Sequence, residues 1–141
     1  MRLRPLVLAL TLAAPLGAQA PDSAALRRAT ACLADTLGLT PHWRLTLRFV
    51  DDSTAAFYGI AEANPFALQA DITYNTLMIA RRAQPIRDIA LHEVLHVVLA
   101  DLTQMAREGF DERIAAFESE KLVRAVVRWP LWGGLCAPKT R

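Results

Sequence analysis

Two histidines and a glutamate lie within one short segment of the 141-residue chain, His92-Glu93-Val94-Leu95-His96. Histidines at positions i and i+4 project from the same face of a helix, so both imidazoles can bind one Zn²⁺ ion. Glu93 then points beside the metal, where its carboxylate can take a proton from attacking water and return it to a leaving amine. The spacing therefore predicts a hydrolytic zinc site on a helix, with His92 and His96 as ligands and Glu93 as the general base.

A hydrolytic zinc site needs a third protein ligand and one open position. Glu118 and Glu120 are the candidates, because a carboxylate on the inner face of the last predicted helix could complete the site. Glu118 lies closer to the apolar face of that helix, whereas Glu120 lies one turn before Val123 and Arg124. These features leave the choice between the two glutamates open.

Other ligands are weaker candidates. Asp101 follows His96 by five residues and so points away from the histidine face. His42, the third histidine of the chain, stands far upstream at the start of a predicted strand. The longer motif with a third histidine needs Gly and His where this chain has Leu99 and Leu102, which excludes that class.

The spacing of apolar residues indicates which elements position these side chains. Along the chain this spacing changes from every second residue, as in strands, to every 3.6 residues, as in helices. After Pro85, apolar side chains recur at helical spacing through the histidine motif, and Gly109 ends this pattern. Upstream segments alternate apolar and polar residues, as half-buried strands do. The sequence predicts helices at 22–37, 86–106 and 111–128, and strands at 43–50, 55–62 and 70–79.

The strands cluster before the long helices, which is typical of the α+β class. The strand segments and their short connections predict a small antiparallel or mixed sheet of about three strands. Residues 21–141 are enough for a single domain with a modest core. With 53% hydrophobic and 21% charged residues, the chain does not belong to the disordered class.

The first twenty residues have the pattern of a signal peptide. Arg2 and Arg4 precede an apolar stretch, and a small-x-small cleavage site ends at Ala20. Pro21 would follow the cut, and proline is unfavourable at that position. The leader could instead be cleaved after Ala18 or be retained as an anchor, and a buried N-terminal helix is the remaining alternative. We expect export to the periplasm or the extracellular space. Loss of the leader lowers the 16 basic residues to 14, equal to the 14 acidic residues, and no basic patch with aromatic residues predicts a nucleic-acid partner.

The two cysteines, Cys32 and Cys136, lie near opposite ends of the mature chain. Export would place them in an oxidising compartment, where a disulfide that closes a loop of about 100 residues would stabilise the fold by about 2–4 kcal/mol. The disulfide is the favoured prediction, and two unpaired buried thiols are the alternative.

The histidine motif, followed by the segment Glu118-Ser119-Glu120-Lys121-Leu122-Val123, resembles the zincin metallopeptidases whose third zinc ligand is a glutamate, the gluzincins. The resemblance is greatest to small single-domain members from bacteria and phages, and it covers roughly residues 43–128. It implies a zincin-like fold, in which the small sheet packs on the histidine helix and on the C-terminal glutamate helix. It also implies a zinc-dependent peptidase with Glu93 as the general base. It also favours Glu120 over Glu118, because such sequences place the glutamate shortly before paired apolar residues.

The resemblance further implies that the strand at 70–79 borders the substrate cleft, where an extended peptide could pair with it. It implies a hydrogen-bond donor for the oxyanion, for which Tyr74 and Tyr58 are the two tyrosines of the chain. Larger members often carry an aspartate four residues after the glutamate, and this chain does not. The expected partner is a peptide or protein substrate, with no membrane after leader cleavage and with the oligomeric state left open.

Two other hypotheses fit parts of the sequence. A non-catalytic zinc-binding module of zincin fold would keep its metal for stability and bind peptides without cleaving them, although such a site has no use for Glu93. A purely structural exported protein would bind no metal.

Overall fold

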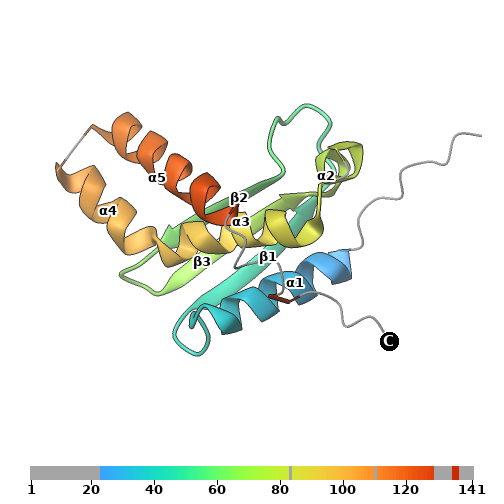
Figure 1. The fold of residues 1–141 in the computed structure, drawn as a ribbon, viewed down its shortest axis with the longest axis horizontal. Helices are drawn as coiled ribbons and strands as arrows, with labels where there is room; N and C mark the ends of the chain where they lie inside the picture. Colours follow the sequence, from blue (N-terminus) through green and yellow to red (C-terminus); the bar gives the residue numbers. More distant parts are fainter. Residues whose placement is uncertain (1–22, 83, 110, 129–134, 137–141) are drawn as a thin grey trace, which may run out of the picture.

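The computed structural model describes residues 23–82, 84–109, 111–128 and 135–136. The strands precede the long helices, as predicted for an α+β fold, and α1 and α3 pack together beside the sheet (Figure 1). The predicted leader at residues 1–20 lies outside the described residues. In chain order the elements are α1 (Ser23–Thr36), β1 (Arg44–Val50), β2 (Gly59–Asn64), β3 (Gln69–Asn75), α2 (Thr76–Arg82), α3 (Ile86–Val98), α4 (Ala100–Gly109) and α5 (Glu112–Val127).

The three strands form a mixed sheet with β3 in the centre, in the order β1-β3-β2. β1 runs parallel to β3, and β2 runs antiparallel to it. Arg44, Arg48 and Glu62 are exposed on the open face of the sheet. On the other face Ile72 and Tyr74 are fully buried in one core with residues of α1 and α3. The alternation predicted at 43–50 is therefore confirmed.

The first helix confirms the prediction at 22–37. Leu26 and Leu33 of α1 are fully buried, two turns apart on the side that faces the core. Gly38 has a φ of 74°, a conformation that glycine adopts without strain, and it ends the helix. The backbone N–H of Leu39 closes the end by donating to the Ala34 carbonyl oxygen at 2.8 Å.

The second strand begins later than predicted. Residues 55–58 belong to a loop, and β2 starts at Gly59. Asp52 Oδ1 accepts hydrogen bonds from the backbone N–H groups of Thr54 and Ala55, which folds the chain into a turn at this point.

The third strand ends earlier than predicted. It stops at Asn75, and residues 76–79 begin α2. The Asn75 side chain accepts a hydrogen bond from the Met78 N–H at 3.4 Å, as an N-cap does, and donates one to the Asp52 carbonyl oxygen at 2.7 Å. Leu77 and Ile79 therefore follow a helical path, and the prediction of a strand through residue 79 is wrong.

The predicted helix at 86–106 is divided into α3 and α4, whose axes differ by 54°. The Thr103 hydroxyl donates to the Leu99 carbonyl oxygen at 3.0 Å, a type of side-chain hydrogen bond that bends helices. No proline or glycine lies in this segment, so the sequence carries no strong signal of the bend. Among the described residues no single helix is long and apolar enough to cross a membrane, and α3 and α4 pass that test only together, as a bent pair.

The last helix confirms the prediction at 111–128. Asp111 Oδ1 accepts a hydrogen bond from the Arg113 N–H at 2.8 Å and caps the N-terminus. Val123 is fully buried and Ala115 nearly so, and α5 packs against α3 and α4. Residues one turn before Val123 share its side of the helix, which places Glu120 toward α3.

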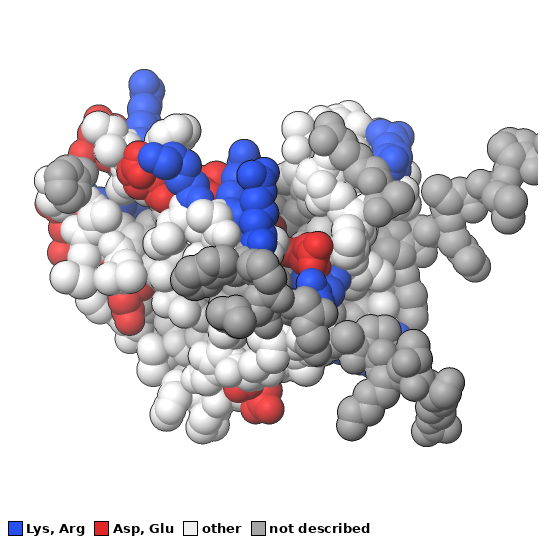
Figure 2. All heavy atoms as spheres, in the orientation of Figure 1, with Lys and Arg blue, Asp and Glu red and all other residues white. Residues whose placement is uncertain are grey.

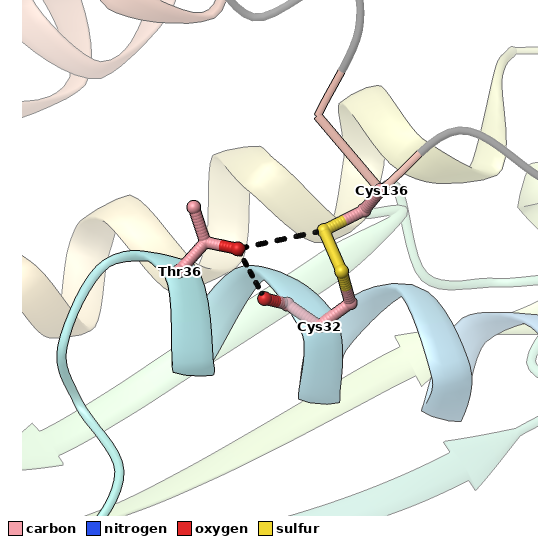
Figure 3. The surroundings of a disulfide bond; sticks show 3 residues. All are labelled: Cys32, Thr36 and Cys136. Carbon is pink, nitrogen blue, oxygen red and sulfur yellow. Dashed lines mark hydrogen bonds between the residues drawn. A yellow bond between two sulfur atoms is a disulfide. The ribbon is translucent and has the colours of Figure 1, made fainter.

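A disulfide joins Cys32 of α1 to Cys136 near the C-terminus (Figure 3). The two Cα atoms are 5.9 Å apart, which is a usual separation for such a bond. On the next turn of α1 the Thr36 hydroxyl donates to the Cys32 carbonyl oxygen at 2.8 Å. The favoured pairing is confirmed, and the alternative of two unpaired thiols is wrong.

Candidate metal centre

Helix α3 buries one side in the core and turns two histidines toward an open cleft. Leu91 and Val94 are fully buried, whereas the side chains of His92 and His96 are 25% and 24% exposed. The Nε2 atoms of the two histidines are 3.2 Å apart. Both imidazoles thus approach one point, as their spacing in the sequence predicts.

Helix α5 brings a carboxylate to the same point. Glu120 Oε2 lies 3.5 Å from His92 Nε2 and 3.2 Å from His96 Nε2. Atoms bound to one tetrahedral zinc ion at about 2.0–2.1 Å lie about 3.3–3.4 Å from each other. The three observed separations are close to this spacing, so His92, His96 and Glu120 form a three-ligand cluster that could hold a metal ion.

Glu118 is not part of the three-ligand cluster. Its side chain is 57% exposed, and both of its oxygens pair with Lys121 Nζ, at 2.9 Å and 3.0 Å. Two residues correspond to about 200° around an α-helix, so Glu118 and Glu120 point to different sides of α5. Glu118 lies instead on an apolar hollow between α4 and α5. The structure thus brings only Glu120 of the two candidates to the histidines.

Glu93 lies beside the cluster, packed against the first residue of β2. A Cβ atom at Gly59 would come within 2.5 Å of Glu93 Oε1, so the carboxyl group fills space that only a glycine leaves open. Glu93 is 4% exposed. Burial first, and then the charge of Glu120, raise the pKa of Glu93 to about 8. Without a metal ion, this carboxyl group is largely protonated at pH 7.

The charges of the three ligands suit a cation. Burial lowers the pKa of His92 and of His96, which favours the neutral imidazoles that bind metals. Burial alone would raise the pKa of Glu120, but the hydrogen bond from Arg124 and the two nearby histidines together lower it. Glu120 is therefore ionised at neutral pH while the imidazoles are uncharged.

The cluster and Glu93 line an open cleft of about 1310 Å³ between β2 and the helices α3, α4 and α5. β2 forms one wall and is an edge strand, since β3 is its only partner in the described sheet. The strand at 70–79 borders the cleft as expected, through Gln69, Ala70 and Asp71 of β3, but the expectation that it is an edge strand is wrong. β3 pairs with β1 on one side and β2 on the other, so its hydrogen-bonding groups are already used.

The other candidate residues lie apart from the cluster. Tyr74 is fully buried on the core face of β3, its hydroxyl 2.8 Å from Thr30 Oγ1, and burial raises its pKa. Tyr58 is half-buried and lines the cleft. His42 and Asp101 are exposed, and neither lines the cleft. Only Tyr58 of the two tyrosines is thus placed to meet a bound molecule.

Two residues at the site carried weak signals in the sequence. A single glycine in a strand often marks close approach by another group, and Gly59 begins β2 in this way. Arg124 follows Glu120 by four residues, a spacing at which oppositely charged side chains meet on a helix. Neither signal identifies its partner until the elements are packed.

No protein-family model, curated protein or solved structure matches the chain. The likeness to the gluzincins therefore stays a prediction, carried by the spacing of the motif and not by relatedness.

Proposed function

We propose that the protein is a zinc-dependent peptidase of the zincin type. The observation that carries this proposal is the separation of 3.2–3.5 Å among His92 Nε2, His96 Nε2 and Glu120 Oε2. Two imidazoles and one carboxylate form a donor set typical of hydrolytic zinc sites, and they leave one position open for water or substrate.

The residues have separate roles in this reaction. His92, His96 and Glu120 would hold the ion, and bound zinc supplies Lewis acidity toward water and the scissile carbonyl. Glu93 takes a proton from the attacking water and passes it to the leaving amine nitrogen. A nearby cation favours the ionised form of a carboxyl group, so the pKa of Glu93 falls from about 8 toward the range of a base that works at neutral pH.

The cleft supports an extended peptide or an unfolded protein segment as the substrate. The free edge of β2 offers backbone N–H and C=O groups with which an extended chain can pair. Tyr58 lines the cleft and is the tyrosine that could donate a hydrogen bond to the oxyanion.

We also infer that the protein acts outside the cytoplasm, in the periplasm or the extracellular space. The disulfide between Cys32 and Cys136 supports this, because such bonds persist in oxidising compartments.

Metal analysis combined with one isosteric variant tests the function. Purified protein should contain close to one zinc ion per chain and cleave unstructured peptides. Glu93→Gln should keep the zinc and lower the cleavage rate by roughly 10²–10⁴-fold, whereas His92→Ala should lose both. A Glu93→Gln variant as active as the parent excludes the mechanism.

Two negative results point to the other hypotheses. Bound zinc without cleavage across a broad peptide library favours the non-catalytic zinc-binding module. Protein that binds no zinc favours the structural protein without metal.

A further inference from the structure

The two carboxylate oxygens of Glu120 have different partners. Oε2 faces the imidazoles of His92 and His96, at 3.5 Å and 3.2 Å from their Nε2 atoms. Oε1 accepts a hydrogen bond from Arg124 Nε at 2.6 Å. The carboxylate is therefore held with one oxygen toward the three-ligand cluster and the other toward a guanidinium group.

The path of the Arg124 side chain follows from its place on α5. Side chains of a helix lean toward its N-terminus, so a residue at i+4 reaches back over residue i. The bond uses Nε, the guanidinium nitrogen nearest the helix, and no other described residue donates a hydrogen bond to Glu120 Oε1. Arg124 lines the same cleft as the cluster. Figure 2 shows basic and acidic side chains next to each other in the region of α5.

The number of oxygens that Glu120 gives to a metal sets the coordination number of the site. A carboxylate can bind through one oxygen or through both. With both oxygens, Glu120 and the two imidazoles would supply four donor atoms, so that a bound water or substrate would make the ion five-coordinate. With one oxygen, they supply three and leave a position for water or substrate.

We propose that Arg124 is a positioning residue, which holds Glu120 Oε1 and so restricts this ligand to one-oxygen binding. The inference rests on the metal site proposed above. Arg124 touches neither the metal nor the reacting atoms in this role. Its effect is to fix the direction of the third ligand and to keep the site four-coordinate when water or substrate is bound.

Helix α5 also carries a matched ion pair outside the site. Lys121 pairs with Glu118 at 2.9 Å, three residues before Arg124 and away from the cluster. Lys121→Ala removes one positive charge and one carboxylate partner from the same helix, but it leaves the cluster untouched. It is therefore the control for Arg124→Ala.

Zinc affinity and the visible spectrum of the Co²⁺-loaded protein test the inference without an activity assay. We expect Arg124→Ala to bind zinc about 10–100-fold more weakly than the parent, as measured by competition with a chromophoric chelator. Its cobalt absorption should weaken toward that of a five- or six-coordinate ion. Arg124→Lys keeps one donor at this position and should recover part of both losses, while Lys121→Ala should match the parent.

Each result has a distinct meaning. If Arg124→Ala and Lys121→Ala agree in zinc affinity and in cobalt spectrum, the role of Arg124 is overturned and the metal site stands. If the parent binds neither metal, the metal site and the role of Arg124 fall together. Circular dichroism verifies the folding of each variant, and Arg124→Met, which has no hydrogen-bond donor and therefore the same expectations, replaces an alanine variant that does not fold.

Discussion

The absence of a side chain at Gly59 leaves room for the carboxyl group of Glu93 at the site. Gly59 has no need of glycine for its backbone, because its φ lies outside the left-handed range. What requires a glycine is the carboxyl group of Glu93, whose Oε1, Cδ and Cγ all lie within 2.6 Å of the place where a Cβ atom would sit. Glu93 is buried and has little room to yield. The first residue of β2 therefore sets the position of Glu93, the proposed general base.

Gly59→Ala should displace Glu93 and lower the cleavage rate by roughly 10²-fold, since a catalytic group misplaced by about 1 Å costs that much. Zinc affinity should stay near that of the parent, because the three ligands lie on α3 and α5. The control is Gly109→Ala, where an added Cβ atom meets nothing within 4 Å. Equal rates for the parent and Gly59→Ala would show that Glu93 is not held by this contact.

The raised pKa of Glu93 makes a prediction for the metal-free protein. A carboxyl group with a folded-state pKa of about 8 and an ordinary value of 4.5 contributes its full stability below pH 4.5 and loses it as the pH rises through 8. Glu93→Gln removes this loss. The free energy of unfolding of the parent should therefore fall relative to Glu93→Gln across this interval, by a few kcal/mol, in denaturant titrations after metal removal. Parallel pH profiles would contradict the burial of this group.

For individual residues, the sequence predicts the side-chain directions that follow from spacing along one helix. It does not predict those that depend on how two helices pack. His92, Glu93 and His96 lie within a helical turn and a half, so their relative directions follow from helix geometry alone. The choice between Glu118 and Glu120 depends on how α5 is rotated against α3. That rotation is set by the burial of Val123, which the apolar pattern of the helix suggests only loosely.

Among the elements, α5 is the helix whose packing should depend most on the proposed metal. Of its described residues only Ala115 and Val123 are buried, whereas α1 and β3 each place several residues in the core. The three-ligand cluster adds a connection from α5 to α3 through Glu120. Helix α5 should therefore open more easily than the sheet when the metal is absent.

Hydrogen exchange measured with zinc and after its removal should show this difference. We expect faster exchange in peptides from α5 without the metal, with little change in α1 or β3. In His92→Ala, which has lost a ligand, addition of zinc should change nothing. A uniform increase across all elements would mean that the metal stabilises the whole fold and not this helix.

The predicted elements exist, and the differences lie at their ends and connections. The bend between α3 and α4 lies where the Thr103 hydroxyl donates to the Leu99 carbonyl oxygen, a hydrogen bond that periodicity does not detect. The strand order β1-β3-β2 depends on which strands pair, and alternation in the sequence is the same for an edge and a central strand. The resemblance to the gluzincins therefore led us to expect peptide pairing on β3, which lines the cleft but is central in the sheet, whereas the free edge beside the cleft belongs to β2.

For the whole molecule, the disulfide is the longest-range constraint. It links residues that are 104 positions apart and connects α1 to the region after α5. The Cys32→Ser, Cys136→Ser double variant should lower the free energy of unfolding by about 2–4 kcal/mol in denaturant titrations. Zinc affinity should be unchanged, because neither cysteine lines the cleft. Equal stability of the double variant and the parent would show that the bond adds nothing to the fold.

The free edge of β2 could also pair with the same strand of a second copy of the chain. An unpaired strand can accept a foreign peptide, and by the same hydrogen bonds it can accept the β2 of another copy, which would block both clefts. Glu62 is exposed near the middle of β2. Two such strands paired antiparallel in a register centred on Glu62 would place their Glu62 carboxylates opposite each other, and like charges so placed repel. Glu62 thus disfavours this register of self-pairing, while peptides without an acidic residue at that position meet no such repulsion.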